Sequence, residues 1–146
     1  MMHGSEFIDV STQIVGLGAP GSRSATSRAY YGSFHAVLEL LDEVECRLPT
    51  KGASHDLAHQ CLGKAADERA KQAAHLLADL HSRRIKADYR LDQLPPNDLQ
   101  YGQFSIAAAQ KILSLLHEFR DHLTRNPSLK DDWVAEVGKL LAIRQV

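Results

Sequence analysis

We predict an all-α protein, an antiparallel bundle of four or five helices, and two observations carry this prediction. Apolar residues recur at three- and four-residue spacing along most of the chain, which is the period of a helix with one buried face. No run of β-branched residues alternates with polar ones, as a half-buried strand would require. With 146 residues and 44% hydrophobic composition, the chain is long enough for about one domain with one core.

Glycines and prolines separate the expected helices. A short helix over residues 7–15 would end at Gly16, Gly18, Pro20 and Gly21. The most regular apolar spacing predicts a helix from Thr26 to about Arg47, interrupted after that by residues 49–52. Further helices are expected over 54–63, 67–89, 97–123 and 131–143.

The helix expected over 97–123 has the clearest buried face after the first long helix. It follows Pro95 and Pro96, begins at a cap formed by Asn97 or Asp98, and stops before Pro127. The apolar stripe that we predict to be buried consists of Phe104, Ala108, Ile112, Leu115 and Phe119.

The bundle is assigned to residues 8–124, and residues 125–146 are expected to form a C-terminal helix that packs on the same domain. Residues 1–7 are left out of the fold. The sequence GSEF at residues 4–7 resembles the translation of two adjacent restriction sites, so this segment is interpreted as a cloning remnant.

The composition narrows the class of protein. The formal net charge of −1 does not indicate a polyanion-binding surface in the overall balance, so a basic patch would have to be local. No apolar run approaches the ~20 residues needed to cross a bilayer, and no secretory signal begins the chain. Cys46 and Cys61 form no CxxC unit. We therefore expect a cytoplasmic protein with reduced thiols and no membrane association.

Two segments that are far apart in the chain resemble one family. Residues 27–36, SRAYYGSFHA, resemble the RAYYAxFHA signature of bacterial HEPN proteins. Residues 83–89, RRIKADY, resemble the R-N-x-x-A-D-Y segment on a later helix of the same proteins. Residues 54–55, Ser-His, fall where members often have a Gly-Ser-His helix start. The resemblance spans about residues 25–123.

This resemblance implies an antiparallel helical bundle that forms homodimers, with the later motif of each subunit close to the dimer cleft. Many members resemble metal-independent ribonucleases, including toxins that are neutralised by a partner, often a minimal nucleotidyltransferase. In those nucleases an Arg is followed four to six residues later by a His. The Arg would hold the scissile phosphate, and the His would move protons to or from the reacting oxygens.

The chain departs from the nuclease pattern at the histidine. The residue five positions after Arg83 is Asp88, and the residue five positions after Arg84 is Tyr89. An ionised aspartate cannot donate a proton and would repel a phosphate. The simplest interpretation is an ion pair between Arg84 and Asp88, four residues apart on one helix. A phosphate or nucleotide site around Arg83, Arg84 and Lys86, or a ribonuclease centre, are the alternatives.

Arg28 and His35 offer a second Arg and His at nuclease spacing, on roughly one face of the earlier helix, with Tyr31 between them. Two turns separate their origins by ~10 Å, so both side chains would have to converge to act on one phosphate. In one interpretation Tyr30, Tyr31 and His35 belong to the core and form hydrogen bonds across helices. In the other, His35 lines the same cleft as Arg83.

No metal and no cofactor are predicted. His55 and His59 lie four residues apart, as in helical zinc sites, but no Glu follows His55 and no third ligand has a recognisable spacing. His117 and His122 are expected on the polar side of their helix, and residues 67–71 on a solvated face with local ion pairs.

Two functions from different classes are compatible with these patterns. The first is a non-catalytic, dimeric HEPN-like domain that binds RNA, a nucleotide or a protein partner, as part of a toxin–antitoxin or defence-type system. Its candidate binding residues are Arg83, Arg84, Lys86, Tyr89, Arg28 and Tyr31. The alternative is an active ribonuclease toxin that uses Arg83 with His35 or Asp88. Either could have a minimal nucleotidyltransferase as antitoxin, with Tyr89 open to modification.

Overall fold

A computed structural model describes residues 2–49 and 54–144, and the predicted all-α class is confirmed for them. These ranges contain six α-helices, where four or five were expected, and one 3-10 helix. The elements are α1 (Gly4–Ile14), α2 (Gly18–Glu43), α3 (Ser54–Gly63), α4 (Glu68–Tyr89), η1 (Pro95–Asn97), α5 (Leu99–Arg125) and α6 (Pro127–Arg144). Most of the interruption expected at 49–52 lies outside the described residues, as do residues 1, 145 and 146.

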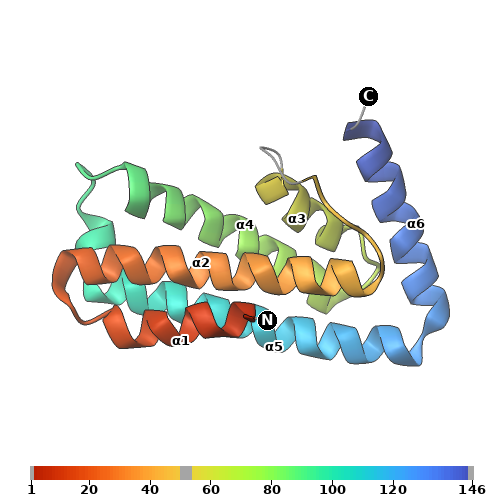
Figure 1. The fold of residues 1–146 in the computed structure, drawn as a ribbon, viewed down its shortest axis with the longest axis horizontal. Helices are drawn as coiled ribbons and strands as arrows, with labels where there is room; N and C mark the ends of the chain where they lie inside the picture. The colour runs from red at the N-terminus through yellow and green to blue at the C-terminus, as the bar shows by residue number, and fades with distance from the viewer. Residues whose placement is uncertain (1, 50–53, 145–146) are drawn as a thin grey trace.

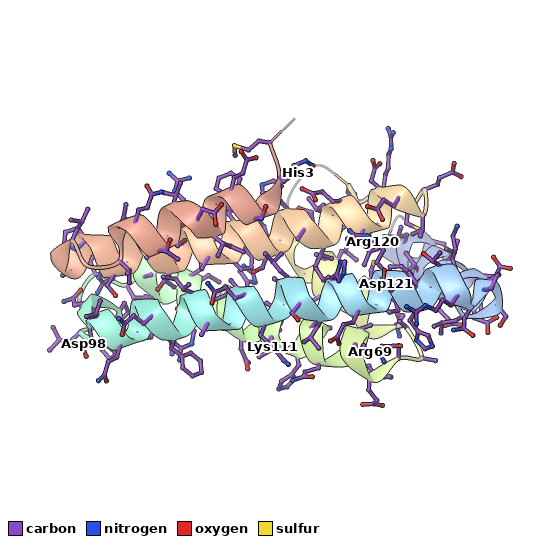
Figure 2. The ribbon with its side chains drawn as sticks, turned by 90° about the horizontal axis from the view of Figure 1, so that it is seen from below. His3, Arg69, Asp98, Lys111, Arg120 and Asp121 are labelled. Carbon is purple, nitrogen blue, oxygen red and sulfur yellow. The ribbon has the colours of Figure 1, made fainter. Side chains whose placement is uncertain are left out.

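The long helices lie side by side and alternate in direction. Helices α2 and α5 run one way along the molecule, whereas α1 and α4 run the other way (Figure 1). Helix α3 packs on α4, and α6 turns away from the bundle axis at the end of α5. Seen from below, α5 lies along α1 and α2, and its Arg120 Nε is 2.9 Å from Glu43 Oε2 of α2 (Figure 2). Among the described residues, no helix is long and apolar enough to cross a membrane.

Helix α2 begins at Gly18 rather than at Thr26. The glycine- and proline-rich segment therefore interrupts the helical structure over fewer residues than expected. Gly18 has a φ of +74°, which glycine adopts without a Cβ clash. Pro20 lies in the first turn, where a missing N–H removes no hydrogen bond of the helix. At Gly21 a Cβ would lie 2.3 Å from the Ile14 carbonyl oxygen, because α1 and α2 approach closely here.

Helix α1 begins at Gly4, within the segment expected to stand outside the fold. A Cβ on Gly4 would lie 2.2 Å from the carbonyl oxygen of Gly32, so the backbones of α1 and α2 are in contact. The Gly4 amide also donates to the Glu39 carboxylate at 3.1 Å. Residues 4–7 are therefore packed on the bundle that was expected to start at residue 8.

The predicted buried stripe of α5 is correct at Ile112, Leu115 and Phe119 and wrong at Phe104, which is 61% exposed. In the first turns of α5 the buried residues are instead Gly102, Ser105, Ile106 and Ala109. Glycine at position 102 allows this face of α5, rather than the Phe104 face, to pack inward. A Cβ on Gly102 would lie only 2.7 Å from Val15 Cγ2.

Helix α6 attaches to the bundle mainly through Trp133 and Val137, the buried residues of its described part. The Trp133 indole packs edge-on against Phe119, with ring centroids 5.1 Å apart. Its Nε1 donates to the Cys61 carbonyl at the end of α3 at 2.8 Å. A buried indole needs such a partner, and this one joins α6 to both α5 and α3.

The start of α4 is held by a buried carboxylate, although residues 67–71 were expected on a solvated face. The Asp67 side chain is 4% exposed and caps α4 by accepting from the Arg69 and Ala70 amides, at 2.8 and 3.2 Å. His122 of α5 lies 2.6 Å from the same carboxylate. Burial raises the Asp67 pKa, but the hydrogen bonds from His122 and the two amides outweigh it, so the pKa is lowered.

The end of α4 is held by Arg23, a buried arginine of α2. Its Nη1 donates to the carbonyl oxygens of Lys86, Ala87 and Arg90, at 3.2, 3.0 and 3.3 Å. Its Nη2 donates to the carbonyl of Gln93 and its Nε to Asn97 Oδ1. The last carbonyls of a helix have no intrahelical donor, and here one guanidinium supplies it.

We expect Arg23→Lys to lower the free energy of unfolding by about 2 to 4 kcal/mol. The single ammonium of lysine cannot donate to all of the carbonyl oxygens to which the planar guanidinium of Arg23 donates. Urea unfolding followed by circular dichroism measures the change. Arg28→Lys, at an exposed position on the same helix, is the control. Equal stability of the two variants would show that Arg23 does not hold α4 in place.

Candidate functional site

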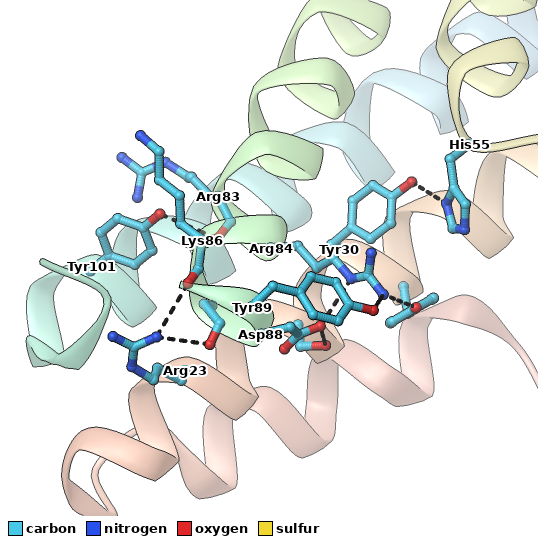
Figure 3. A network of polar contacts seen from close by, with 12 residues as sticks. Arg23, Tyr30, His55, Arg83, Arg84, Lys86, Asp88, Tyr89 and Tyr101 are labelled. Atoms are coloured by element: carbon cyan, nitrogen blue, oxygen red, sulfur yellow. Dashed lines mark hydrogen bonds and ion pairs between the residues drawn. The ribbon is translucent and has the colours of Figure 1, made fainter. Parts of the chain in front are cut away.

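The two segments that resemble HEPN motifs meet where α2 packs on α4 (Figure 3). Arg84 Nε lies 3.0 Å from Asp88 Oδ2, at ion-pair distance but without hydrogen-bond geometry, and this confirms the predicted ion pair. Arg84 Nη2 donates to the Tyr31 hydroxyl. Ser27, in the earlier motif, donates to Asp88 at 3.1 Å. The motifs thus form one polar contact between two helices.

Arg84 is enclosed by this contact. Its Cζ lies 5.0 Å from the Tyr31 ring centroid and 5.2 Å from that of Tyr89, and its side chain is 12% exposed. A further hydrogen bond runs from Nη2 to the Tyr89 hydroxyl at 3.3 Å. With its charge balanced by Asp88 and its surface covered by two rings, Arg84 has little capacity left for a phosphate.

Beside Arg84 lies a cluster of packed rings, which we call the ring cluster: Tyr30, Phe34, His55 and His81. The Tyr30 hydroxyl is 2.6 Å from His55 Nδ1, so the predicted hydrogen bond of Tyr30 across helices is confirmed. The ring centroids of Tyr30 and His81 are 4.9 Å apart, and those of Phe34 and His55 are 4.5 Å apart. The cluster joins α2, α3 and α4.

Burial sets the protonation of this cluster. It lowers the pKa of His55, and the positive charge of Arg84 lowers it further. Burial also lowers the pKa of His81, with smaller contributions from His55 and Arg84. The pKa of Tyr30 is raised by burial, so the phenol keeps its proton and can donate it to His55 Nδ1.

Arg83 points to the other side of α4, toward α5. Its Cζ lies 4.4 Å from the ring centroids of both Tyr101 and Phe104. Nη1 is buried without a hydrogen-bond partner, whereas the other guanidinium nitrogens are not buried and donate to no described residue. Lys86, three residues later, is exposed, and neither cation has an ion pair among the described residues. Both side chains extend in the same direction (Figure 3).

Arg28 and His35 lie on the side of α2 that faces α1. The Phe7 ring lies 5.9 Å from Arg28 Cζ and stacks on His35, with ring centroids 5.6 Å apart. His35 also lines a hollow of about 780 Å³ with Cys46 and Leu48. No contact between described residues joins His35 to Arg83. Arg83 is therefore separate from Arg84 and from His35, whereas His35 borders the ring cluster, since its ring centroid lies 5.5 Å from that of Phe34.

No group of three or more His, Cys, Asp or Glu side chains in the described ranges is arranged to hold a metal ion. His55 belongs to the ring cluster, whereas His59 Nε2 is 3.9 Å from Asp56 Oδ1. Cys46 and Cys61 are both buried and free.

Several residues around the candidate site escaped prediction. His81 is three residues before Arg84, and this spacing could have placed both on one face of α4. Tyr101 and Phe104 share a face of α5 for the same reason. Which neighbouring helix each face meets depends on packing between distant segments, and no local pattern reports it.

No protein-family model, curated protein or solved structure matches this chain. The resemblance to HEPN proteins rests on the residues of the two motifs.

We expect Arg84→Gln to raise the pKa of both His55 and His81, because a nearby positive charge that disfavours the imidazolium is removed. Titration of the imidazole resonances by NMR measures the shift. Arg83→Gln removes the same charge on the α5 side and should leave both resonances unchanged. The same shift in the two variants would mean that the effect is not local.

Proposed function

We propose that this chain is a HEPN-like domain that binds single-stranded RNA and does not cleave it. The surface that would do so, called here the α4–α5 surface, consists of Arg83, Lys86, Tyr101 and Phe104. Tyr89, another predicted binding residue of α4, lies beside Arg84. The observation that carries the proposal is the free guanidinium of Arg83, placed against two rings and without a carboxylate partner.

These groups match the chemistry of a single-stranded nucleic acid. The rings of Tyr101 and Phe104 orient the guanidinium, so its unburied nitrogens can donate to a phosphate with little loss of side-chain freedom. Lys86 adds a second positive charge on the same side of α4. Phe104, at 61% exposure, offers a ring on which a base can stack.

The contacts of Arg83 favour binding over cleavage. Asp88 is engaged by Arg84 and Ser27, and the His35 ring stacks on Phe7. Neither residue contacts Arg83, so the groups that the ribonuclease alternative needs at one phosphate are separate. Tyr31 is also engaged, through its hydroxyl, with Arg84. Among the described residues, neither a histidine ring nor a carboxylate, the groups that the ribonuclease alternative requires, contacts the free guanidinium.

The homodimer, the nucleotidyltransferase partner and the toxin–antitoxin role belong to the same proposal and rest on the resemblance. Three leucines at the end of the bundle that carries the α4–α5 surface support an interface there: Leu91, Leu94 and Leu99 are 73%, 72% and 48% exposed. Tyr89, 65% exposed, is the proposed target if that partner transfers a nucleotide.

If the chain forms the proposed homodimer, light scattering should give a solution mass of twice 16.2 kDa. Leu94→Asp should reduce it to the monomer mass, because a carboxylate would be buried in the interface. A wild-type protein at monomer mass contradicts the dimer and leaves the RNA proposal standing.

RNA binding is tested by fluorescence anisotropy with a labelled single-stranded oligoribonucleotide. Arg83→Gln should weaken binding and reduce the slope of log affinity against log salt by about 0.7, since one phosphate contact is lost. Phe104→Ala should weaken binding by about 1 to 3 kcal/mol without changing that slope, since stacking releases no counterion.

Arg125→Gln is the matched control, because it removes the same charge from an exposed site in the last turn of α5. The proposal fails if this control weakens binding as much as Arg83→Gln does. Cleavage of the oligoribonucleotide by the wild-type chain, lost in Arg83→Gln, would instead establish the ribonuclease alternative.

A further inference from the structure

A second concave surface, which we call the basic groove, lies where α3, α4 and α6 meet. It has a volume of about 650 Å³, and four of its lining residues can carry a positive charge: His59, Lys64, Lys71 and His75. None of these residues belongs to the α4–α5 surface or to the ring cluster.

Helix geometry explains why these side chains converge. Lys71 and His75 are four residues apart and share one face of α4. His59 and Lys64 come from the last turns of α3 and the residue after it, across the groove. A Cβ on Gly63 would lie 3.7 Å from that of Ala74, which is van der Waals contact, so α3 and α4 lie close together at this point.

The groove is shaped by small and apolar residues. Ala74 and Ala78 of α4 and Leu140 of α6 are among its lining residues. Larger side chains at the two alanines would fill the space. Polar and apolar residues therefore line the groove together, as is usual in ligand sites.

The two lysines are unpaired. Neither Lys64 nor Lys71 forms an ion pair within the described ranges, although exposed cations elsewhere do, such as Lys139 with Glu136 at 3.0 Å. Like charges that face one another across a groove repel, and a bound anion would offset that repulsion.

The nearby carboxylates leave this charge largely intact. Asp56 lies 3.9 Å from His59 Nε2, and its side chain is 67% exposed. Glu68 and Asp79 are exposed on α4 and pair with neither lysine. Among the described residues, one of the four basic residues of the groove, His59, has a carboxylate within ion-pair distance.

From this arrangement we propose that the basic groove binds phosphate groups. Two ammonium groups supply charge and hydrogen bonds, and two imidazoles supply donors. A free polyphosphate, such as that of a nucleoside triphosphate, and a stretch of nucleic-acid backbone present the same chemistry. The site does not depend on the RNA surface proposed above, because the two share no residue.

The test is a titration of the full chain, labelled with ¹⁵N, by sodium tripolyphosphate and separately by the single-stranded oligoribonucleotide. Tripolyphosphate should shift the amide resonances of residues around Lys64, Lys71 and His75 in a saturable way. The double variant Lys64→Gln, Lys71→Gln should bind it at least about tenfold more weakly, because two charge-assisted contacts are lost.

The matched control is Lys111→Gln, Lys130→Gln, which removes the same charge from exposed positions outside the groove and should bind tripolyphosphate as the wild type does. Lys111 lies on α5 (Figure 2). Circular dichroism and the melting temperature check that both double variants fold. Equal weakening in the two, or no saturable binding of either phosphate compound, overturns the proposal.

The two ligands distinguish the source of the phosphate. Binding of tripolyphosphate alone in the groove identifies a free polyphosphate ligand, whereas competition by the oligoribonucleotide identifies the nucleic-acid backbone. Measuring both ligands with the Arg83→Gln variant distinguishes this proposal from the RNA-binding proposal. Loss of oligoribonucleotide binding with tripolyphosphate binding intact shows that the groove acts independently of the α4–α5 surface.

Discussion

The guanidinium of Arg23 lies where α2, the end of α4 and η1 meet, and it donates to four carbonyl oxygens and one amide oxygen there. Because the last turn of α4 is fixed against α2, Arg84 of α4 can reach the Tyr31 hydroxyl of α2. Because η1 is fixed as well, the chain enters α5 at an angle that brings Phe104 over Arg83. The contact of Arg84 with α2 and the α4–α5 surface thus both depend on one buried arginine.

Two consecutive arginines have opposite roles because a helix turns about 100° per residue. Arg84 faces α2, where a carboxylate and two phenol rings surround it. Arg83 faces α5, where two rings pack on it, no described carboxylate pairs with it and part of the guanidinium stays free. Charge that is compensated within the fold stabilises helix packing, and charge that is left uncompensated is available to a ligand.

Sequence patterns predicted what depends on residues close in the chain. The ion pair of Arg84 with Asp88 follows from their four-residue spacing, and the helical periods follow from apolar repeats. Phe104 was wrongly placed in the core, because Gly102 lets another face of α5 pack inward. The bonds of Arg23 join residues more than sixty positions apart, a relation that no local spacing contains.

The attachment of α6 has a consequence for how the molecule opens. Its described part buries only Trp133 and Val137, whereas α2 and α5 are buried along much of their length. Detaching α6 would therefore remove Trp133, Val137 and partly buried residues such as Leu140 from the core and break the hydrogen bond to Cys61, while the contacts among the other helices stay in place. Since Leu140 leaves with it, the basic groove is a shallower surface in that partly open state.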